Sequence, residues 1–553
     1  MEMELREIVL KHALLNAIKY NGKASEKIVI GKAIAEVKDR SKIKEIVEFA
    51  KEIVEYVNSL NVEEQKKIFK EKFGEIKEEK REEKEKIPKA GGRVVTRFAP
   101  NPNGPLHLGH VRAALISYEF AKQNNGKFIL RFEDTNPRNV IPSMYDAIKQ
   151  DLKWLGISWQ EEYMQSQRLN IYYKYAEILV KEGKAYVCEC DKEKFRKLKN
   201  EGKPCKCRAK PSLNRWRKMI NGDYDEGQAV LRLKTDLKHE NPAVRDFPIM
   251  RVVKHEHPLA KGYYVWPLYN FACAIDDHLM QITRVFRGKE HSINTICQSY
   301  IFKYLNWKMP EIFEYGRLSI KNAELSKSKI VEGIKQGKYE GFDDVKLATI
   351  AALRRRGFQA EAIRNLILDV GLKRVDVEVT WQNLESYNRK VVDKIANRYF
   401  LVYNPMLLKV CNAPSIKQIS LPLHPDLKER GKRKIEMTIE GKHLVFYVNR
   451  EDMINKKVVR LKDLFNVEVV NVKDNEIIAE FAGKEIIRGV PKIQWIPKRF
   501  SMKIKIIKPD GIIEGLCEPN CIKEIGKVVQ FERVCFARIE KVENKKILSL
   551  IHI

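Results

Sequence analysis

The N-terminal part of the chain has the hydrophobic spacing of amphipathic helices. Between positions 43 and 60, apolar side chains recur every three or four residues, as a buried helix face requires. A charged run from Glu75 to Lys86 follows, and we interpret its alternating signs as a solvated linker. Pro88 and the pair Gly91-Gly92 end this run. The pattern predicts a helical domain with its linker over residues 1–90.

At Arg93 the pattern changes to short strands separated by helices. The mostly β-branched run 94–98 is followed by a loop rich in proline and glycine and by an apolar-periodic helix from about Leu108. A second strand is predicted at Gly126–Phe132. Strand, loop, helix and strand in this order predict a parallel α/β sheet, and we assign residues 93–340 to that domain.

The C-terminal third of the chain shows two further patterns. Helical spacing returns beyond about Ile330, and we assign residues 341–402 to a helical region. From about Tyr403, short alternating strands with turn signals dominate. Many short strands of this kind predict small β-barrels over residues 403–553.

Composition adds a prediction about the partner. The chain has 553 residues, which corresponds to roughly three to five domains at about 100–200 residues each. Lys and Arg number 104 against 74 Asp and Glu, a formal net charge of +30. A surplus of this size favours a polyanionic partner such as nucleic acid. The alternative is a general bias towards charged residues for solubility or high growth temperature.

The sequence shows no feature of a secreted or membrane-spanning protein. The segment MEMELREIVLKHALL carries acidic residues in its first turn and is followed by no small-residue cleavage site. No run of about eighteen apolar residues occurs. The ten cysteines are not spaced like a secreted disulfide framework. We therefore expect a cytoplasmic protein that does not interact with membranes.

The segment RFAPNPNGPLHLGH, from Arg97 to His110, joins the first predicted strand to the following helix. Free backbone N–H groups and the positive end of the helix dipole attract anions at such a junction. His107 and His110 can donate hydrogen bonds to phosphate oxygens, and Gly109 lets a ring or backbone approach closely. Two histidines in a helix also occur for structural reasons, but the loop before them favours a phosphate site.

A second candidate for phosphate binding is the segment ELSKSK, from Glu324 to Lys329. Lysine is a flexible point charge suited to a departing pyrophosphate, and serine adds hydroxyl donors. Taken alone, this segment would be interpreted as a solvated basic loop.

Together the two segments resemble the HIGH and KMSKS signatures of class I aminoacyl-tRNA synthetases. HLGH at His107–His110 matches the first signature, and Leu325-Ser326-Lys327-Ser328 matches the last four positions of the second. Glu324 stands where the first lysine of the signature usually is, so one secondary nucleotide contact of the family is not carried over. The lysine taken as catalytic in the family corresponds to Lys327.

Further segments are similar to glutamyl-tRNA synthetases of the archaeal type, whose nearest relatives are the glutaminyl enzymes. These segments are RFAPNPNGPLHLGH, RFEDTNP at Arg131–Pro137 and WPLYNFACAIDDHLMQITRVFRGKEH at Trp266–His291. The resemblance extends from about Arg93 to the end of the chain. It implies a multidomain α/β fold. The N-terminal helical domain is followed by a Rossmann-like catalytic domain (93–340), which carries an inserted acceptor-binding region at about 186–265. A helical stem-contact region (341–402) and β-barrels that bind the anticodon (403–553) complete the chain.

The resemblance also implies the residues of the active site. The catalytic residues are His107, His110 and Lys327. The residues that bind ATP are Pro100, Asn103, Gly104, His107, Gly109, His110, Leu325, Ser326, Lys327 and Ser328. Of the residues that bind glutamate, Arg97 and Glu133 hold the α-groups, Tyr269 borders the side chain and Arg287 faces the side-chain carboxylate.

Arg287 favours glutamate over glutamine as the amino acid. The matching position is arginine in glutamyl enzymes and uncharged in glutaminyl ones, and an arginine–carboxylate fork is strong and charge-specific. A buried arginine facing a neutral amide would be left unpaired, at a cost on the order of several kcal/mol. The alternative is that Arg287 only pairs with Glu290.

Four cysteines form two close pairs within a lysine-rich stretch. Cys188 and Cys190 are separated from Cys205 and Cys207 by a gap of 14 residues. Four thiolates can complete a tetrahedral zinc shell, although the usual spacing within a pair is two to four residues. Some glutamyl-tRNA synthetases carry a zinc knuckle in the matching region. A structural zinc ion is therefore expected, and reduced structural cysteines are the alternative.

The implied reaction joins L-glutamate to the 3′ end of tRNA(Glu) through glutamyl-adenylate, with ATP and Mg²⁺ as cosubstrates and AMP and diphosphate as products. Whether tRNA(Gln) is also glutamylated is open, and residues 1–90 could contact tRNA or dock a partner protein. Glutaminyl-tRNA synthetase is the closest rival, opposed by Arg287 and by Glu133 in place of the usual aspartate. The β-barrels oppose a shortened paralogue that glutamylates a modified base, and the intact HLGH and LSKS oppose an inactive tRNA-binding scaffold.

Overall fold

The computed structural model describes residues 2–19, 22–37, 42–74, 90–210, 212–324, 326–473, 475–543 and 546–551. The chain divides into two compact units, Met1–Glu85 and Lys86–Ile553. The predicted linker Glu75–Lys86 and the predicted ATP ligand Leu325 lie outside the described residues.

The first unit is helical, as the apolar spacing predicts. Its described residues form α1 (Glu2–Lys19), α2 (Glu26–Val37), α3 (Ile43–Ser59) and α4 (Val62–Phe73). Gln65 of α4 is fully buried, and its side-chain amide donates to the carbonyls of Gly22 (3.0 Å) and Val57 (2.8 Å), which ties α4 to the turn after α1 and to the end of α3. The predicted buried face is wrong at Ile43 and Val47, which are 37% and 41% exposed because the core lies under the neighbouring face of α3.

The second unit contains the predicted parallel sheet. Thr283 N donates to Val95 O (2.9 Å), so the pair β8–β9 adjoins the ladder β1–β2–β3 at β1. This gives the order β3–β2–β1–β8–β9, a doubly wound arrangement in which ligands bind outside the carboxyl ends of the strands where the order reverses. The parallel strands are β1 (Val95–Phe98), β2 (Lys127–Phe132), β3 (Glu161–Met164), β8 (Arg284–Gly288) and β9 (Glu311–Tyr315).

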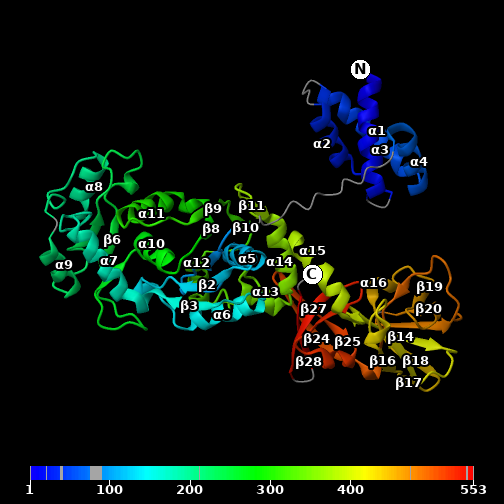
Figure 1. Cartoon of the computed structure of the whole chain (residues 1–553). Coiled ribbons are helices and arrows are strands. Elements are labelled where there is room, and N and C mark those ends of the chain that lie inside the picture. The colour runs from blue at the N-terminus through cyan, green and yellow to red at the C-terminus, as the bar shows by residue number, and fades with distance from the viewer. Residues whose placement is uncertain are drawn as a thin grey trace. The chain divides into compact units, whose positions relative to one another are not determined.

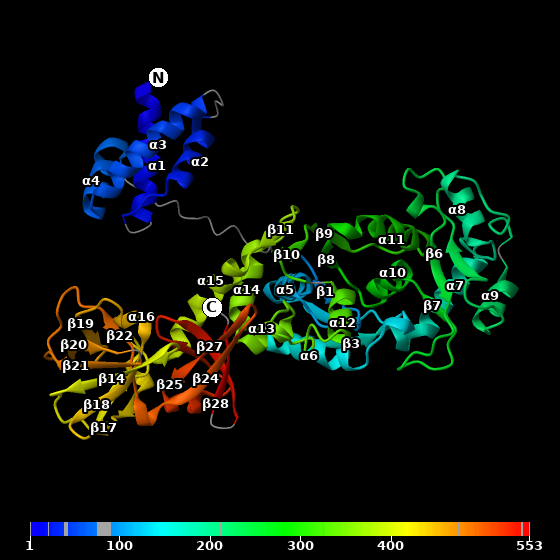
Figure 2. The same ribbon diagram turned by 180° about the vertical axis from the view of Figure 1, so that it is seen from behind.

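Helices alternate with these strands along the chain, and α5 and α6 bury apolar residues of β1 and β2. Phe120 of α5 packs against Phe286 of β8, with their ring centroids 4.9 Å apart. The helices are α5 (Leu108–Gln123), α6 (Ser143–Trp154), α7 (Leu169–Lys181), α10 (Tyr269–Leu279) and α11 (Ser292–Tyr304). Figures 1 and 2 show α5 among the strands of this sheet, whereas α7 lies beside the antiparallel sheet of the inserted region, into whose core it packs with α10 and α11.

The region predicted as an insertion forms an antiparallel sheet of its own. The strands pair in the order β4–β5–β6–β7, and two helices, α8 and α9, lie beside them in Figure 1. Their bounds are β4 (Ala185–Cys188), α8 (Lys192–Asn200), α9 (Leu213–Ile220), β5 (Val230–Leu233), β6 (Pro248–Val252) and β7 (Val265–Pro267).

A mainly helical segment follows the catalytic sheet. The parallel pair β10–β11 holds the start of the SKS loop against this segment, because Lys321 N donates to Val379 O (2.9 Å). Arg355 of α13 pairs with Glu540 of β27 (2.8 Å), which joins the helical segment to the C-terminal strands. The elements are β10 (Leu318–Ile320), α12 (Lys327–Lys335), α13 (Ile350–Arg356), α14 (Ala360–Val370), β11 (Val377–Val379) and α15 (Trp381–Ile395).

Two large sheets form the C-terminal part. The eight-stranded sheet closes on itself, because β22 pairs with β19 and the adjoining β23 pairs with β18. Trp495, between these two short strands, is fully buried. The strands of this sheet are β14 (Pro405–Cys411), β17 (Ile439–Glu440), β18 (His443–Asn449), β19 (Val458–Leu461), β20 (Asn466–Val472), β21 (Glu476–Phe481), β22 (Lys492–Ile493) and β23 (Ile496–Pro497).

The seven-stranded sheet combines strands that precede the eight-stranded sheet in the chain with strands that follow it. Its strands β12 and β13 lie before residue 403, so the β-region begins a few residues earlier than the sequence pattern predicts. The strands are β12 (Asn397–Tyr399), β13 (Leu401–Val402), β24 (Met502–Lys508), β25 (Gly511–Cys517), β26 (Val528–Phe531), β27 (Cys535–Glu543) and β28 (Lys546–Ile551). A separate hairpin, β15 (Gln418–Pro422) and β16 (Lys432–Glu436), and the short helix α16 (Arg450–Met453) complete the region.

The predicted fold class, a multidomain α/β protein with barrel-like sheets at its C-terminal end, is confirmed. Among the helices that the structure describes, none combines the length and the apolar character needed to cross a membrane.

Candidate active site

A cavity of about 280 Å³ opens beside the loop that follows β1 and leads into α5. His107 and His110 line it together with Asn103 and Lys327, although more than 200 residues separate the two segments in the chain. Ile350 N donates to Leu106 O (2.9 Å), so the start of α13 fixes this loop from the other side. The HLGH and SKS segments therefore meet at the carboxyl end of β1, where a doubly wound sheet binds its ligand.

The two histidines of this loop are half-buried, stacked on each other and neutral. His107 caps α5, and its Nδ1 accepts a hydrogen bond from Gly109 N (3.1 Å). The ring centroids of His107 and His110 are 3.8 Å apart. Burial lowers the pKa of His107 to about 4 and that of His110 well below its usual value. Nδ1 of His110 is buried without a hydrogen-bond partner among the described residues, so it remains available to a ligand.

Lys327 is the first residue of α12 and reaches across the cavity to the HLGH loop. Its ammonium group donates a hydrogen bond to the side-chain oxygen of Asn103. A Cβ at Gly104 would lie 2.3 Å from Lys327 Cε, so any other residue would displace the lysine side chain from this position. Burial lowers the pKa of Lys327 to about 8. The lysine is therefore a partly buried cation whose described partner is a neutral amide.

The atypical Glu324 has a clear role in the SKS loop. Its carboxylate accepts a hydrogen bond from Ser326 N (2.8 Å) and lies 3.4 Å from the Lys329 ammonium. The hydroxyl groups of Ser326 and Ser328 are 3.2 Å apart, and neither residue lines the cavity. Glu324 thus holds the start of α12 in place of a lysine that would face the nucleotide.

A network of charges, three of them buried and one, Glu133, half-buried, includes the predicted α-group ligands of glutamate. Asp277 of α10 lies between two arginines, 3.2 Å from Arg97 Nε and 2.7 Å from Arg131 Nη1. Arg131 also donates to Glu133 (3.2 Å). Burial alone would raise the pKa of Asp277, but the charges of Arg97 and Arg131 lower it below its ordinary value. The charges of the two arginines are therefore balanced by the carboxylates of Asp277 and Glu133 within this network.

Helix α10 presents three polar groups to the same pocket at a spacing of four residues. Tyr269, Cys273 and Asp277 lie one above the other on one helix face. The Cys273 thiol donates to Glu133 Oε1 (2.9 Å), and burial raises the pKa of Tyr269, which keeps its hydroxyl as a donor. The charges of Glu133, Arg97 and Arg287 all act on Tyr269. The structure thus brings the four predicted glutamate ligands together.

Arg287 is a buried cation with neutral partners. Its side chain is 5% exposed and donates to Thr295 Oγ1 (2.5 Å) and Gln298 Oε1 (3.0 Å). Nε of Arg287 has no hydrogen-bond partner among the described residues. Among the described residues, the hydrogen-bond partners of its guanidinium are both neutral, and Glu314 is reached only through the Thr295 hydroxyl (3.1 Å). A buried arginine of this kind lacks a neutralising anion.

Sequence reasoning missed three members of the glutamate pocket. Asp277, Arg131 and Cys273 all lie within segments that resemble the family, but no motif marks them as site residues. The spacing of Tyr269, Cys273 and Asp277 by four residues is a signal that could have found two of them. Conversely, Pro100 does not line the cavity; its carbonyl instead accepts from Glu133 N (2.9 Å), which links the HLGH loop to the glutamate pocket.

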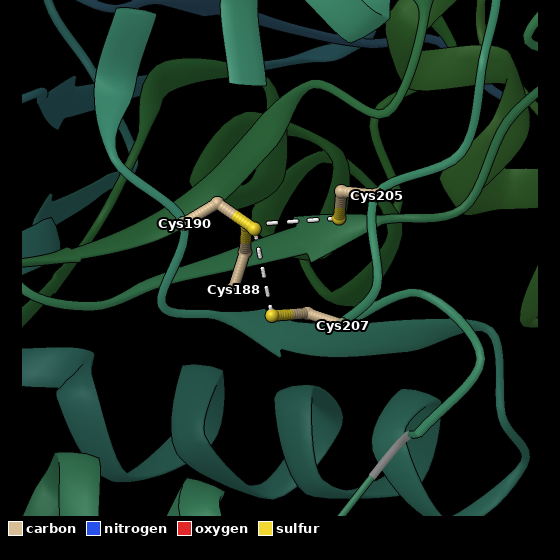
Figure 3. Close-up of side chains that lie close together, drawn as sticks. All are labelled: Cys188, Cys190, Cys205 and Cys207. Carbon is tan, nitrogen blue, oxygen red and sulfur yellow. Dashed lines mark hydrogen bonds between the residues drawn. The ribbon is translucent and has the colours of Figure 1, made fainter. Parts of the chain in front are cut away.

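The four cysteines of the inserted region converge on one point, as Figure 3 shows. The Sγ atoms of Cys188 and Cys205 are 3.9 Å apart, and those of Cys190 and Cys207 are 3.7 Å apart. All four sulfur atoms lie within 4.8 Å of one another. Four thiolates about 2.3 Å from a central zinc ion would be separated by about 3.8 Å, so the set fits a tetrahedral ion.

Comparison with known protein families covers most of the second unit. Residues 93–394 match the family model described as "tRNA synthetases class I (E and Q), catalytic domain". Residues 396–484 match the model described as "tRNA synthetases class I (E and Q), anti-codon binding domain".

Curated relatives match the chain from end to end. A glutamate–tRNA ligase from Pyrococcus abyssi is 50% identical over 99% of both chains. The corresponding ligase from Methanocaldococcus jannaschii is 45% identical over 98% of both chains. A solved glutamate tRNA ligase from Elizabethkingia meningosepticum, in complex with its amino acid, is 25% identical, with a TM-score of 0.42, over 55% of this chain and 71% of that chain. The family models and the full-length relatives place this chain in the glutamate–tRNA ligase family of class I aminoacyl-tRNA synthetases.

Proposed function

We propose that this protein joins L-glutamate to the 3′ end of tRNA(Glu), using ATP and passing through glutamyl-adenylate. The observation that carries the proposal is Arg287, a buried cation with neutral partners in a pocket whose other charges balance. A substrate carboxylate supplies the missing anion, whereas the amide of glutamine does not. AMP and diphosphate are the other products.

In the first step, the α-carboxylate of glutamate attacks the α-phosphorus of ATP, and diphosphate leaves. His107 and His110, both neutral, donate hydrogen bonds to phosphate oxygens, and Lys327 holds the departing diphosphate. Mg²⁺ enters with ATP and neutralises phosphate charge. In the second step, a terminal ribose hydroxyl of the tRNA attacks the carbonyl of the adenylate and releases AMP. Positioning and charge stabilisation supply most of the rate.

The roles proposed for the glutamate ligands follow from the charge network. Arg97 binds the α-carboxylate and Glu133 the α-ammonium group, each held by the network around Asp277. Tyr269 borders the substrate side chain, and Arg287 forms a fork with its carboxylate. Asp277 does not reach the substrate in this scheme and acts as a positioning residue.

ATP–pyrophosphate exchange, measured with glutamate and tRNA present, tests the proposal. We expect Lys327→Ala to reduce the exchange rate by about two to three orders of magnitude with an unchanged melting temperature. Lys329→Ala is the matched control, because Lys329 stands in the first turn of the same helix, α12, with a side chain that is 72% exposed. A near-normal rate in Lys327→Ala would contradict the role of this lysine, and no exchange in the unmodified protein would support an inactive scaffold.

We further propose a structural zinc ion bound by Cys188, Cys190, Cys205 and Cys207. The support is the fit of the four sulfur positions to a tetrahedral ion. Four protein ligands leave no open coordination position, so the ion would hold the end of β4 to the segment after α8 and take no part in the reaction.

The balanced charge of the first unit favours a protein over tRNA as its binding partner. Residues 1–85 contain 19 basic and 19 acidic residues, so the whole surplus of +30 belongs to residues 86–553. A domain without net charge is a poor match for a polyanion. We therefore propose that it docks a protein, and a chain lacking residues 1–85 should keep its KM for tRNA. A large rise in that KM would instead assign the unit to tRNA binding.

A further inference from the structure

A second large cavity, of about 610 Å³, lies outside the amino-acid and ATP sites. It is formed where the loop before the SKS segment, the ends of α13 and α15, and the turn between β24 and β25 meet. Figure 1 shows α13 and α15 between the catalytic strands and the strands β24 to β28. The roles proposed above for glutamate and ATP make no use of this cavity.

Arg356 is the most informative residue of this cavity. It is the last residue of α13 and is only 3% exposed, yet its Nε and Nη1 have no hydrogen-bond partner among the described residues. Its ion pair with Glu385 is long at 3.9 Å. Burial lowers the pKa of Arg356 to about 10, which shows how little its charge is compensated. The guanidinium also lies over the rings of Phe358 and Trp381, but rings do not replace hydrogen-bond acceptors, so its two unused donors favour binding of an external acceptor.

The remaining lining identifies the chemistry of that acceptor. Lys338, Lys346 and Lys508 add three cations, against the two carboxylates of Glu385 and Asp510. Together with Arg356, the residues that line the cavity carry four positive and two negative charges, and this surplus favours an anionic ligand. A planar guanidinium with adjacent ammonium groups suits a phosphate.

An aromatic ring stands beside these cations. The Arg356 guanidinium lies 4.8 Å from the ring centroid of Trp381, the first residue of α15. Trp381 is half-buried and also lines the cavity, so a flat ring or a sugar next to the bound phosphate can pack against it. Phosphate together with an adjacent ring or sugar is the chemistry of a nucleotide.

We infer that this cavity binds a phosphodiester group of the tRNA substrate, with the neighbouring nucleotide against Trp381. The inference rests on the proposed function, because that function supplies the tRNA. The position supports tRNA over a free nucleotide, since the cavity lies between the SKS loop and the β-sheets, along the part of the chain that carries the positive surplus. Asn322, in the turn that follows β10 and precedes the segment with Lys327, also lines the cavity.

Equilibrium binding of tRNA(Glu) to the full chain, measured over a range of salt concentrations, tests this inference. The double variant Lys346→Ala/Lys508→Ala should raise Kd for tRNA roughly tenfold at low salt and make the log–log salt slope shallower by about 0.7–0.9 for each lysine–phosphate ion pair that the substitutions remove. Neither lysine is buried, so folding is expected to be intact. Lys335→Ala is the matched control, because Lys335 is an exposed lysine of α12 outside the cavity.

Arg356→Gln provides a second test, checked by its melting temperature. In a folded variant, Kd for tRNA should rise at least tenfold while KM for ATP stays within about twofold. Wild-type tRNA affinity and salt slope in both variants would overturn the inference, and so would loss of 5′-AMP binding with tRNA affinity retained. Absence of tRNA binding by the unmodified chain would instead contradict the proposed function.

Discussion

At the scale of single residues, one buried and one half-buried cation, both with neutral partners, define the site. Arg287 is contacted by the hydroxyl of Thr295 and the amide of Gln298, and Lys327 by the amide of Asn103. Each lies where a substrate anion is proposed, the side-chain carboxylate of glutamate for the arginine and the diphosphate for the lysine. Because their protein partners are neutral, these two cations can pair with a substrate anion directly. If a protein carboxylate were paired with them, the substrate would have to displace it first.

Arg287→Gln tests the selection of glutamate. Removing the cation should raise KM for glutamate roughly a hundredfold or more, because the substrate carboxylate then has no buried cation to pair with, while KM for ATP changes by less than about twofold. The measurement is steady-state ATP–pyrophosphate exchange at varied glutamate. Glu290→Gln is the control, since the exposed Glu290 forms no ion pair with Arg287. An unchanged KM for glutamate in Arg287→Gln would show that the assignment is wrong.

The pKa of Lys327 predicts a pH dependence. Burial lowers it to about 8, so the ammonium group is present below that pH and is deprotonated as the pH rises through it. ATP favours the charged form, and kcat/KM for ATP should therefore fall above about pH 8. In Lys327→Arg the cation stays charged, and the fall should disappear over the same range. A fall that persists unchanged in Lys327→Arg would assign it to another group.

The sequence predicted the individual ligands better than the network that supports them. His107, His110 and Lys327 stand in recognisable short segments, and the structure gathers them around one cavity. Asp277 and Arg131 were missed because their role depends on a contact between residues 146 positions apart. Periodicity along one segment carries no information on which buried arginine meets which buried carboxylate.

At the scale of elements, short strands and loops do most of the positioning. The strand β1 leads into the HLGH loop, and β10 leads into the loop before Ser326, Lys327 and Ser328. The helix α10 carries three polar groups on one face. In the inserted region, Cys188 ends β4 and Asp191 caps α8, which turns the chain back so that both cysteine pairs face each other.

Metal analysis tests the zinc site at this scale. Purified protein should contain about one equivalent of zinc, and Cys205→Ser should lose it and lower the melting temperature of the inserted region. Cys411→Ser is the control, because Cys411 lies on β14, far along the chain from the four cysteines. Less than half an equivalent of zinc in the unmodified protein would count against the site.

Most elements could be predicted from local pattern, but their assembly could not. The short strands expected beyond about Tyr403 are present, β18 and β20 among them. The pairing of β12 and β13 with strands from residue 502 onwards was not predictable, because the intervening barrel interrupts the sheet by about a hundred residues. Alternation of side chains specifies the faces of a strand and leaves its partner undefined.

At the scale of the whole molecule, charge is distributed unequally between the two units. Residues 86–553 carry the entire surplus of +30, and residues 1–85 carry none. The long-range field that would steer tRNA therefore originates in the unit that contains the synthetase family matches. Composition predicted a polyanionic partner for the chain, and the division into units restricts that prediction to the second unit.

Aminoacylation of purified tRNA(Glu) and tRNA(Gln), each with labelled glutamate and with labelled glutamine, tests the central claim most directly. The account predicts that glutamate is transferred to tRNA(Glu), and transfer of glutamate to tRNA(Gln) as well would define an enzyme of relaxed tRNA specificity. Transfer of glutamine to tRNA(Gln) without any transfer of glutamate would contradict the role of Arg287 and the proposed function.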